Sequence, residues 1–441
     1  MKFPVLPTVV TLLLAAYAAD AQTPAAPRAP HVAFIEGRPF ADVIKKAKAE
    51  KKPILLDIVA SWCQPCKMMD RTTFADPEVV AWTGKATISA RVDAEKGEGK
   101  KLAFRYAIRS FPTVLFLNSD GTEIDRLLGA FGPVEFKNYG SDILAGKSKL
   151  VEGLAKLGKT WSAESAAQWI NTLSQRNDLA RLRPIALRVL HEDPELVRSE
   201  TLDALGSLVA LEDYSESLSA ETTDLLTTYV PRLQSEPRGV VFAMVLAREL
   251  ARRGDVVEVR KLVEPTVKRA GETSGIASDL LTALGHAEKR AGKLEAATAA
   301  YRRAMASADA VGAAPYSRAI KQLDLAEALA LAGKPAEAKA ALATALERAG
   351  REAGVLTRAA RVWLQLKSPQ QALELAKKAV SLSNGEDAAA QGVLASSLVA
   401  TGDEGGGLAA WKRASEIEPE NLEYQKPLFA EKKKKPAAKP S

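Results

Sequence analysis

Apolar positions between residues 33 and 158 change their period from segment to segment. Residues 40–50 carry them at helical spacing up to Pro53, whereas residues 54–60 are apolar except for Asp57. The second pattern is typical of a strand buried on both faces. Further strands are expected at 86–92, 113–117 and 123–128, and helices at 64–71, from 77 onward and at 133–145. This alternation predicts an α/β sheet, in a domain that we place at residues 34–158.

A longer period governs the chain from about residue 239 to residue 425. A turn residue, usually glycine, recurs at intervals of 38, 41, 34 and 35 residues, and a small residue follows it by five positions in the later units. One unit of this kind cannot bury its own apolar face, so several must stack into an all-α solenoid. Residues 160–238 are helical in composition without a clean repeat, and are either degenerate units or a cap. The recurring residues are Gly254, Gly292 with Ala297, Gly333 with Ala338, Lys367 with Ala372, and Gly402 with Gly407.

The first residues of the chain have the pattern of a signal peptide. A short positive start precedes an apolar run at residues 9–19, and Ala21 stands at a permitted cleavage position, as Ala18 also does. The run is too short to span a bilayer comfortably, so we expect no transmembrane segment in the mature chain. The sequence therefore predicts a signal peptide at 1–21, a linker at 22–33, and export to the periplasm or, alternatively, to the medium.

Charge is concentrated at the other end of the chain. Of the formal net charge of +7, +5 falls from Lys426 onward, in a lysine-rich segment. The remaining domains lack the basic surface that duplex binding requires, so no nucleic acid is expected among the partners. Residues 426–441 are predicted to be a solvated, disordered tail, with weak attachment to an anionic surface as the alternative.

The only two cysteines, Cys63 and Cys66, lie two residues apart and close too small a loop to stabilise a fold. Haem attachment requires histidine after the second cysteine, where Lys67 stands. Zinc requires two more ligands, and no second cysteine pair exists. We therefore expect neither metal nor cofactor, and redox chemistry at the cysteines. The three histidines, interpreted as ordinary surface or capping residues, are His31, His191 and His286.

Four features of residues 34–150 stand in a specific order along the chain: Leu56-Asp57, Trp62-Cys63-Gln64-Pro65-Cys66-Lys67, Phe111-Pro112-Thr113 and Gly129-Ala130. With them, this part of the chain resembles the thioredoxin family. The motif at 62–67 follows the predicted strand and precedes a Phe-Pro-Thr sequence at 111–113, and this combination is far more specific than the cysteine pair alone. Residues 71–77 look like exported members related to the soluble domains of periplasmic disulfide reductases. The later region, for which Leu284-Gly285, Tyr301 and Ala304 are the clearest positions, resembles tetratricopeptide repeats.

The resemblance implies a role for each cysteine and for one acid. Cys63 would lie at a helix N-terminus, which stabilises the attacking thiolate, and Cys66 would resolve the mixed disulfide. Asp57 would be a buried carboxylate that exchanges a proton with Cys66, although an ordinary salt-bridged or capping residue is the alternative. Ser89 occupies the place where family members often carry a lysine partner for that acid, and Arg91 is the candidate substitute.

The resemblance also implies a substrate-binding edge. Pro112 would be a cis proline facing the sulfurs, so that the backbone of Phe111 can bind an extended substrate strand. Trp62 and Phe111 would form an apolar rim, with plain core packing as the alternative for Phe111, and Gly129 lies on the same side.

Two functions remain in view. The first is an exported thiol–disulfide oxidoreductase that acts on protein thiols or disulfides, needs a redox partner protein, and binds a peptide or protein ligand through its helical repeats. The second is a protein-binding scaffold whose thioredoxin fold is structural or only weakly redox-active. The repeats are alternatively a structural or dimerising appendage. Gln64 between the cysteines leaves the direction of the reaction open.

Overall fold

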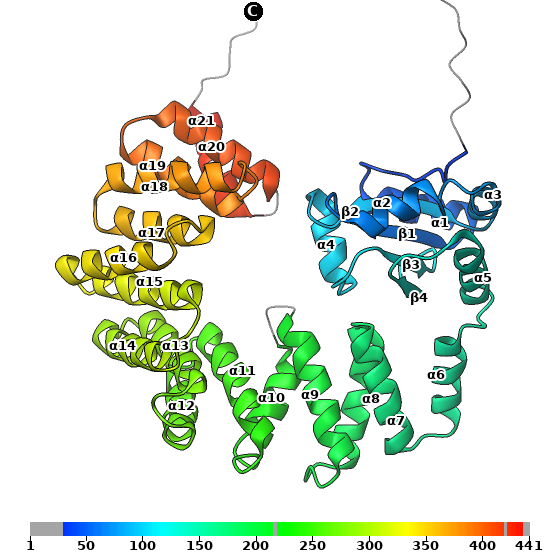
Figure 1. The fold of residues 1–441 in the computed structure, drawn as a ribbon, viewed down its shortest axis with the longest axis horizontal. Helices are drawn as coiled ribbons and strands as arrows, with labels where there is room; N and C mark the ends of the chain where they lie inside the picture. The colour runs from blue at the N-terminus through cyan, green and yellow to red at the C-terminus, as the bar shows by residue number, and fades with distance from the viewer. Residues whose placement is uncertain (1–29, 215–217, 419–420, 435–441) are drawn as a thin grey trace, which may run out of the picture. The chain divides into compact units, whose positions relative to one another are not determined.

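The computed structural model describes residues 30–214, 218–418 and 421–434 (Figure 1). Two compact units divide the chain, with the main boundary after Lys156. The predicted signal peptide and the first part of the predicted linker lie outside the described residues. The end of that linker is structured, because Val32 is buried and its N–H donates to the carbonyl oxygen of Phe74 at 2.8 Å.

A four-stranded mixed sheet organises the first unit, in the order β2-β1-β3-β4. Its strands are β1 (Ile54–Val59), β2 (Ile88–Asp93), β3 (Thr113–Leu117) and β4 (Glu123–Leu128). β1 pairs with β2 in parallel and with β3 antiparallel, and β3 pairs antiparallel with β4. The register places Asp57 of β1 directly across from Arg91 of β2.

The first unit also contains five helices, α1 to α5, and the sequence predicted four of them. An aromatic core forms around Phe136, whose ring packs edge-on or tilted against the rings of Phe74, Trp82 and Phe116. The helix that the sequence did not predict contains Gly97 and Gly99, which are poor helix formers. The helices are α1 (Phe40–Glu50), α2 (Gln64–Arg71), α3 (Pro77–Ala86), α4 (Gly97–Arg105) and α5 (Pro133–Leu144).

The rest of the described chain is helical. A helix at the boundary, α6 (Lys149–Lys159), is followed by fifteen more. They are α7 (Ala163–Gln175), α8 (Leu179–Glu192), α9 (Ser199–Tyr214), α10 (Ala220–Tyr229), α11 (Pro237–Arg253), α12 (Val256–Ala270), α13 (Gly275–Arg290), α14 (Leu294–Ala310), α15 (Pro315–Leu331), α16 (Pro335–Ala349), α17 (Ala353–Gln365), α18 (Pro369–Leu382), α19 (Ala388–Ala400), α20 (Glu404–Ile417) and α21 (Leu422–Lys434).

These helices form a stack of hairpins from α7 to α20 (Figure 1). We call the odd-numbered helices α7 to α19 the first helices of the hairpins; their starts lie 35 to 40 residues apart. Most first helices contact the next one, as α7 does with α9, α9 with α11, and α11 with α13. Residues 160–238 therefore continue the stack. Their period escaped detection because the turn after α7 uses Asn177, not glycine, at a positive φ of 55°.

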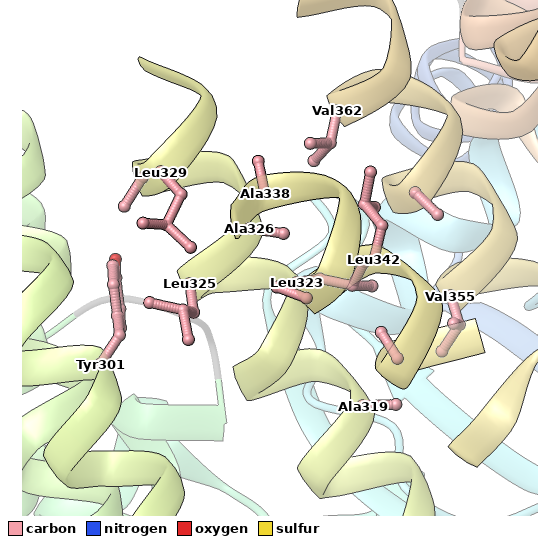
Figure 2. Close-up of a cluster of buried hydrophobic side chains, with 14 of the residues drawn as sticks. Tyr301, Ala319, Leu323, Leu325, Ala326, Leu329, Ala338, Leu342, Val355 and Val362 are labelled. Atoms are coloured by element: carbon pink, nitrogen blue, oxygen red, sulfur yellow. The ribbon is translucent and has the colours of Figure 1, made fainter. Parts of the chain in front are cut away.

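The predicted turn residues Gly254, Gly292, Gly333, Lys367 and Gly402 all have positive φ, as left-handed helix ends require. The small residues after the turns are buried where helices approach. Figure 2 shows part of the resulting core, in which Leu325 and Leu329 of α15 face the ring of Tyr301. Gly285 lies so near this ring that an added Cβ would come within 2.5 Å of it.

The prediction of a disordered tail at 426–441 is wrong for residues 426–434, which belong to α21, and the rest of that segment lies outside the described residues. The lysines and glutamate of this segment are good helix formers, and α21 packs on α20 with Leu428 half-buried. Helix propensity and packing therefore both favour the helix. Among the described residues, none of the helices combines the length and the apolar character needed to cross a bilayer.

Candidate active site

The two cysteines meet at the start of α2, directly after β1. Cys63 is the N-cap residue, and its Sγ accepts a hydrogen bond from the N–H of Cys66 at 3.1 Å. Pro65 occupies the first turn, where a missing N–H costs nothing. A disulfide joins Cys63 to Cys66. The sulfur of Cys63 thus lies where the unpaired N–H groups and the helix dipole favour negative charge.

A second loop brings the predicted substrate edge to the disulfide. The Phe111–Pro112 peptide bond is cis, as the resemblance implied. The half-buried Phe111 packs against the cluster formed by Ala60, Cys63 and Cys66. The N–H of Gly129 donates to the carbonyl oxygen of Pro112 at 2.9 Å, which places Gly129 beside the proline.

Trp62 and Phe111 form the expected aromatic pair. Their ring centroids lie 5.8 Å apart in an edge-to-face arrangement. The indole N–H of Trp62 donates to Oε1 of Glu95 at 2.8 Å, although the Trp62 residue is 61% exposed. Both predictions for Phe111 therefore describe part of its surroundings: it packs on the cysteines, and it also forms an apolar rim with the exposed Trp62. Glu95 was not foreseen, because no local pattern links it to Trp62.

Both sulfur-bearing residues are covered in this disulfide form. Cys63 is 2% exposed and Cys66 is 7% exposed. A substrate sulfur in line with the disulfide therefore requires the covering side chains to move. Phe111 is the large apolar group among those that pack on the cysteines.

Asp57 is completely buried on β1. Burial raises the pKa of its carboxyl to about 6, while the Arg91 guanidinium, whose Nε donates to Oδ2 at 2.8 Å, lowers it. Oδ1 is buried without a hydrogen-bond partner in the described part of the chain. The salt-bridged alternative thus describes the geometry correctly, yet burial outweighs the arginine and keeps the pKa of the carboxyl raised, at about 6.

Arg91 is the cationic partner of this acid. Its Nη1 donates to Oδ1 of Asp70 at 2.7 Å, and its guanidinium lies 4.1 Å from the centre of the Phe34 ring. Oδ1 of Asp70 also lies 3.0 Å from Nε2 of His31. Arg91 therefore connects the buried Asp57 to a surface carboxylate.

The sequence identified Arg91 only as a substitute for the missing lysine, and left Asp70 and Phe34 unassigned. The parallel register of β1 and β2 is the signal for Arg91, because it makes Asp57 and Arg91 direct neighbours across the strands. Asp70 follows Cys66 by four residues on α2, hence on the same helix face.

No group of three or more histidine, cysteine, aspartate or glutamate residues is placed to hold a metal ion within the part of the chain that the structure describes. The candidate site is therefore described by its sulfurs, its buried acid and its aromatic rim.

Comparison with known proteins assigns the first unit. Residues 40–143 match a family model described as a thioredoxin-like domain. This part of the chain is a thioredoxin-like domain. The fold predicted from the sequence, a thioredoxin-like α/β domain followed by all-α helical repeats, is thereby confirmed.

Relatives of the thioredoxin-like domain include thiol:disulfide interchange proteins. The DsbD protein of Cronobacter sakazakii is 34% identical over 103 residues, which cover 23% of this chain and 18% of that protein. The DsbD protein of Photorhabdus laumondii is 36% identical over 91 residues, 20% of this chain and 16% of that protein. The chain thus spans less than a fifth of the length of either relative.

Solved structures of other proteins are similar to parts of this chain. A thioredoxin from Thermus thermophilus is 24% identical with a TM-score of 0.24, covering 25% of this chain and 87% of that one. A tetratricopeptide repeat protein from Parabacteroides merdae is 12% identical with a TM-score of 0.47, covering 60% of this chain and 97% of that one.

Proposed function

We propose that the protein is an exported thiol–disulfide oxidoreductase that acts on protein substrates, and that its helical repeats bind a protein partner. The observation that carries the proposal is the placement of Cys63 as the N-cap of α2, bonded to Cys66 and packed against Phe111 of the cis Phe111–Pro112 peptide. The likeness to disulfide interchange proteins supports the same chemistry. Export rests on the apolar pattern of residues 9–19.

In the reducing direction the reaction starts from the dithiol. The Cys63 thiolate attacks one sulfur of a substrate disulfide, a Cys63–substrate bond forms, and the other substrate sulfur leaves as a thiolate. Cys66 then attacks Sγ of Cys63, the Cys63–Cys66 disulfide forms, and the second substrate sulfur leaves. The substrate gains the two electrons that the cysteine pair loses. A dithiol on a redox partner protein restores the pair, and the oxidising direction uses the same steps in reverse.

Asp57 is the proposed proton acceptor for Cys66. Cys66 attacks as a thiolate, so its proton must leave first. A carboxyl whose pKa is raised to about 6 by burial can take that proton and release it again near neutral pH. Its Oδ1, buried without a partner in the described chain, has a free acceptor site for it.

The substrate is proposed to bind as an extended strand beside Phe111 and Pro112. In an extended segment backbone N–H and C=O groups are available for pairing, and apolar side chains can contact Trp62 and Phe111. The same contact would displace the side chains that cover the sulfurs. Gly129, bonded to the Pro112 carbonyl, completes this edge.

The scaffold function remains the second candidate, because Cys63 is only 2% exposed. Reduction of insulin by dithiothreitol separates the two candidates. We expect the wild-type chain to accelerate it and Cys63→Ser to reduce the acceleration by at least about a hundredfold. Ser61→Ala, an exposed hydroxyl two residues away, is the matched control and should stay within about twofold.

Equal activity of the wild type and Cys63→Ser would end the enzymatic proposal in favour of the scaffold. Cys66→Ala should retain the first step and accumulate the mixed disulfide with the substrate, which is visible on a non-reducing gel. Equilibration of the wild-type pair with glutathione then gives the reduction potential, and with it the direction in which the protein works.

A further inference from the structure

A pocket of about 730 Å³ lies in the helical unit, away from the cysteines in sequence. Residues near the C-terminal ends of α9, α11, α13 and α15 line it, so that four successive first helices contribute. Its volume is within the range of pockets that bind ligands. Its charged lining residues are Asp213, Arg248, Arg252, Lys289 and Arg290, with His286 between them.

The cations at this pocket outnumber the carboxylates that contact them. Asp213 pairs with Arg248 at 2.7 Å, and Glu327 pairs with Lys289 at 2.7 Å. Two arginines share a single acid, because both Arg252 and Arg253 contact Glu249. The exposed Arg290 has no ion pair in the described part of the chain. The lining thus carries four cations. Arg290 has no acid partner there, and Arg252 shares Glu249 with Arg253, which lies outside the lining.

Cations at the C-terminal end of a helix also stabilise the helix dipole, and this is the ordinary explanation for them. It does not explain their distribution. α11 and α13 carry two basic residues each in the last turn, whereas the first helices α7, α9, α15, α17 and α19 carry none. Among the four first helices that line the pocket, the basic ends occur on the two central ones, α11 and α13.

Apolar surface accompanies the excess charge. Leu331, at the end of α15, lines the pocket and is 48% exposed, and Ala251 of α11 lies in the same lining. A single inorganic anion could use an arginine but not the leucine. A polypeptide with carboxylates and apolar side chains in alternation could use both.

We infer that this pocket binds an acidic, extended segment of a partner protein, with carboxylates on Arg252 and Arg290 and an apolar side chain against Leu331. The inference rests on the proposed partner-binding role of the helical repeats. Guanidinium groups bind carboxylates through paired hydrogen bonds, which favours glutamate and aspartate as the anchors. A nucleic acid strand would place phosphates beside the carboxylate of Asp213, which disfavours it as the ligand.

Fluorescence anisotropy with two labelled peptides tests the inference. One alternates glutamate and leucine over about eight residues, and the other replaces each glutamate by glutamine. The full-length Cys63→Ser/Cys66→Ser chain is used, so that no mixed disulfide contributes to binding. We expect it to bind the acidic peptide at least about tenfold more tightly than the glutamine peptide, with an affinity that falls as salt is added.

Substitutions then locate the site. Arg252→Glu/Arg290→Glu should weaken binding of the acidic peptide by at least about tenfold, and Arg290→Gln should weaken it by about threefold. Lys268→Glu is the matched control, because Lys268 is an exposed cation in the last turn of α12 and lies outside the pocket lining. It should stay within about twofold. Arg290→Gln keeps the test valid if the double reversal does not fold, as judged by circular dichroism.

Several results would overturn the inference. These are equal binding of the two peptides, equal loss in Lys268→Glu and Arg290→Gln, competition by citrate at the same concentration as the peptide, or tighter binding of a thymidine oligonucleotide. The insulin assay on the wild-type chain is independent of all of them. Failure of the pocket therefore leaves the redox proposal standing, and failure of the redox proposal leaves the pocket measurable.

Discussion

The thioredoxin-like domain and the helical unit use their residues in opposite ways. In the first, each part of the site is unique: the buried acid Asp57, the cysteine pair and the cis peptide bond. The ion pair between Asp57 and Arg91 joins two strands at a single register position. In the second, ion pairs recur between neighbouring hairpins. Arg238 contacts Asp203 and Arg302 contacts Glu337, each 35 residues apart. A site built from unique residues fails when one of them changes, whereas a repeated contact is one of many.

The comparison also separates chemistry from stability. The side chains that we assign to the reaction form only a small buried cluster around the disulfide, and the buried Asp57 opposes folding when it is ionised. The helical unit depends instead on small residues and a few large ones that fill the space between helices. Substitutions should therefore change activity in one unit and the free energy of unfolding in the other.

The largest expected effect is on stability in the helical unit. Tyr301 is fully buried among residues of α13, α14 and α15, so Tyr301→Ala should lower the free energy of unfolding of this unit by about 3–5 kcal/mol. Amide hydrogen exchange in residues 275–349 measures this unit separately from the first. Insulin reduction should be unchanged, and loss of activity would contradict the separation of chemistry from stability.

Tyr301→Phe is the control for this prediction. The hydroxyl of Tyr301 is buried without a hydrogen-bond partner in the described chain, so its removal leaves no new unpaired group. We expect a change of less than about 1 kcal/mol, and a favourable sign would be consistent with the lost desolvation cost.

The next largest effect is expected at Asp57, where a substitution should raise the free energy of unfolding. Its folded-state pKa of about 6 lies above the ordinary value of 3.8, so the folded chain holds a proton that the unfolded chain releases between these pH values. The free energy of unfolding should therefore fall by about 3 kcal/mol as pH rises from about 3 to about 7, most steeply between the two pKa values. Asp57→Asn should abolish this dependence and stabilise the domain at pH 7 by about 1–3 kcal/mol, because the lost Arg91 pairing offsets part of the gain.

The same substitution should slow the exchange reaction by about tenfold or more, since no carboxyl remains to take the proton of Cys66. Hydrogen exchange in residues 54–59 reports stability, and insulin reduction reports activity. Arg91→Met sharpens the result, because loss of the guanidinium should move the pKa of Asp57 above about 6 and shift the pH dependence upward. A pH dependence that survives in Asp57→Asn would assign it to another group.

Much of this architecture could be predicted from the sequence, for identifiable reasons. The strand at Ile54–Val59, the start of the helix after Cys63 and the hairpin turns all depend on local patterns that the chain itself carries. Cys63, Cys66 and Asp57 stand at fixed spacing in one segment, and the resemblance added Pro112 from another. The period of the repeats could be detected in the sequence where glycine occupies the turn.

What escaped prediction depends on contacts between distant segments or on an unusual residue in a familiar place. Asp70 of α2 contacts Arg91 of β2, and His31 contacts Asp70, only once the chain is folded. Glu95 likewise meets Trp62 from a distant part of the sequence. The first hairpin was missed because Asn177 takes the left-handed turn position. The basic pocket combines residues from four helices, each of which reads in isolation as an ordinary helix end.

The smallest expected effect tests the repeated part of the molecule at its turns. Lys367 has φ of 55° at the position where other hairpins place glycine, a conformation that costs a residue with a Cβ about 1 kcal/mol. Lys367→Gly should therefore stabilise the helical unit by about 0.5–1 kcal/mol. Gly333→Ala should destabilise it by a similar amount, because φ is 72° there. An added Cβ would meet no atom within 4 Å, so the backbone conformation is the only cost expected. Hydrogen exchange in the hairpins on either side of each turn measures both changes. Equal signs for the two variants would show that contacts specific to each hairpin outweigh the shared geometry, and the units would then differ in energy despite their common period.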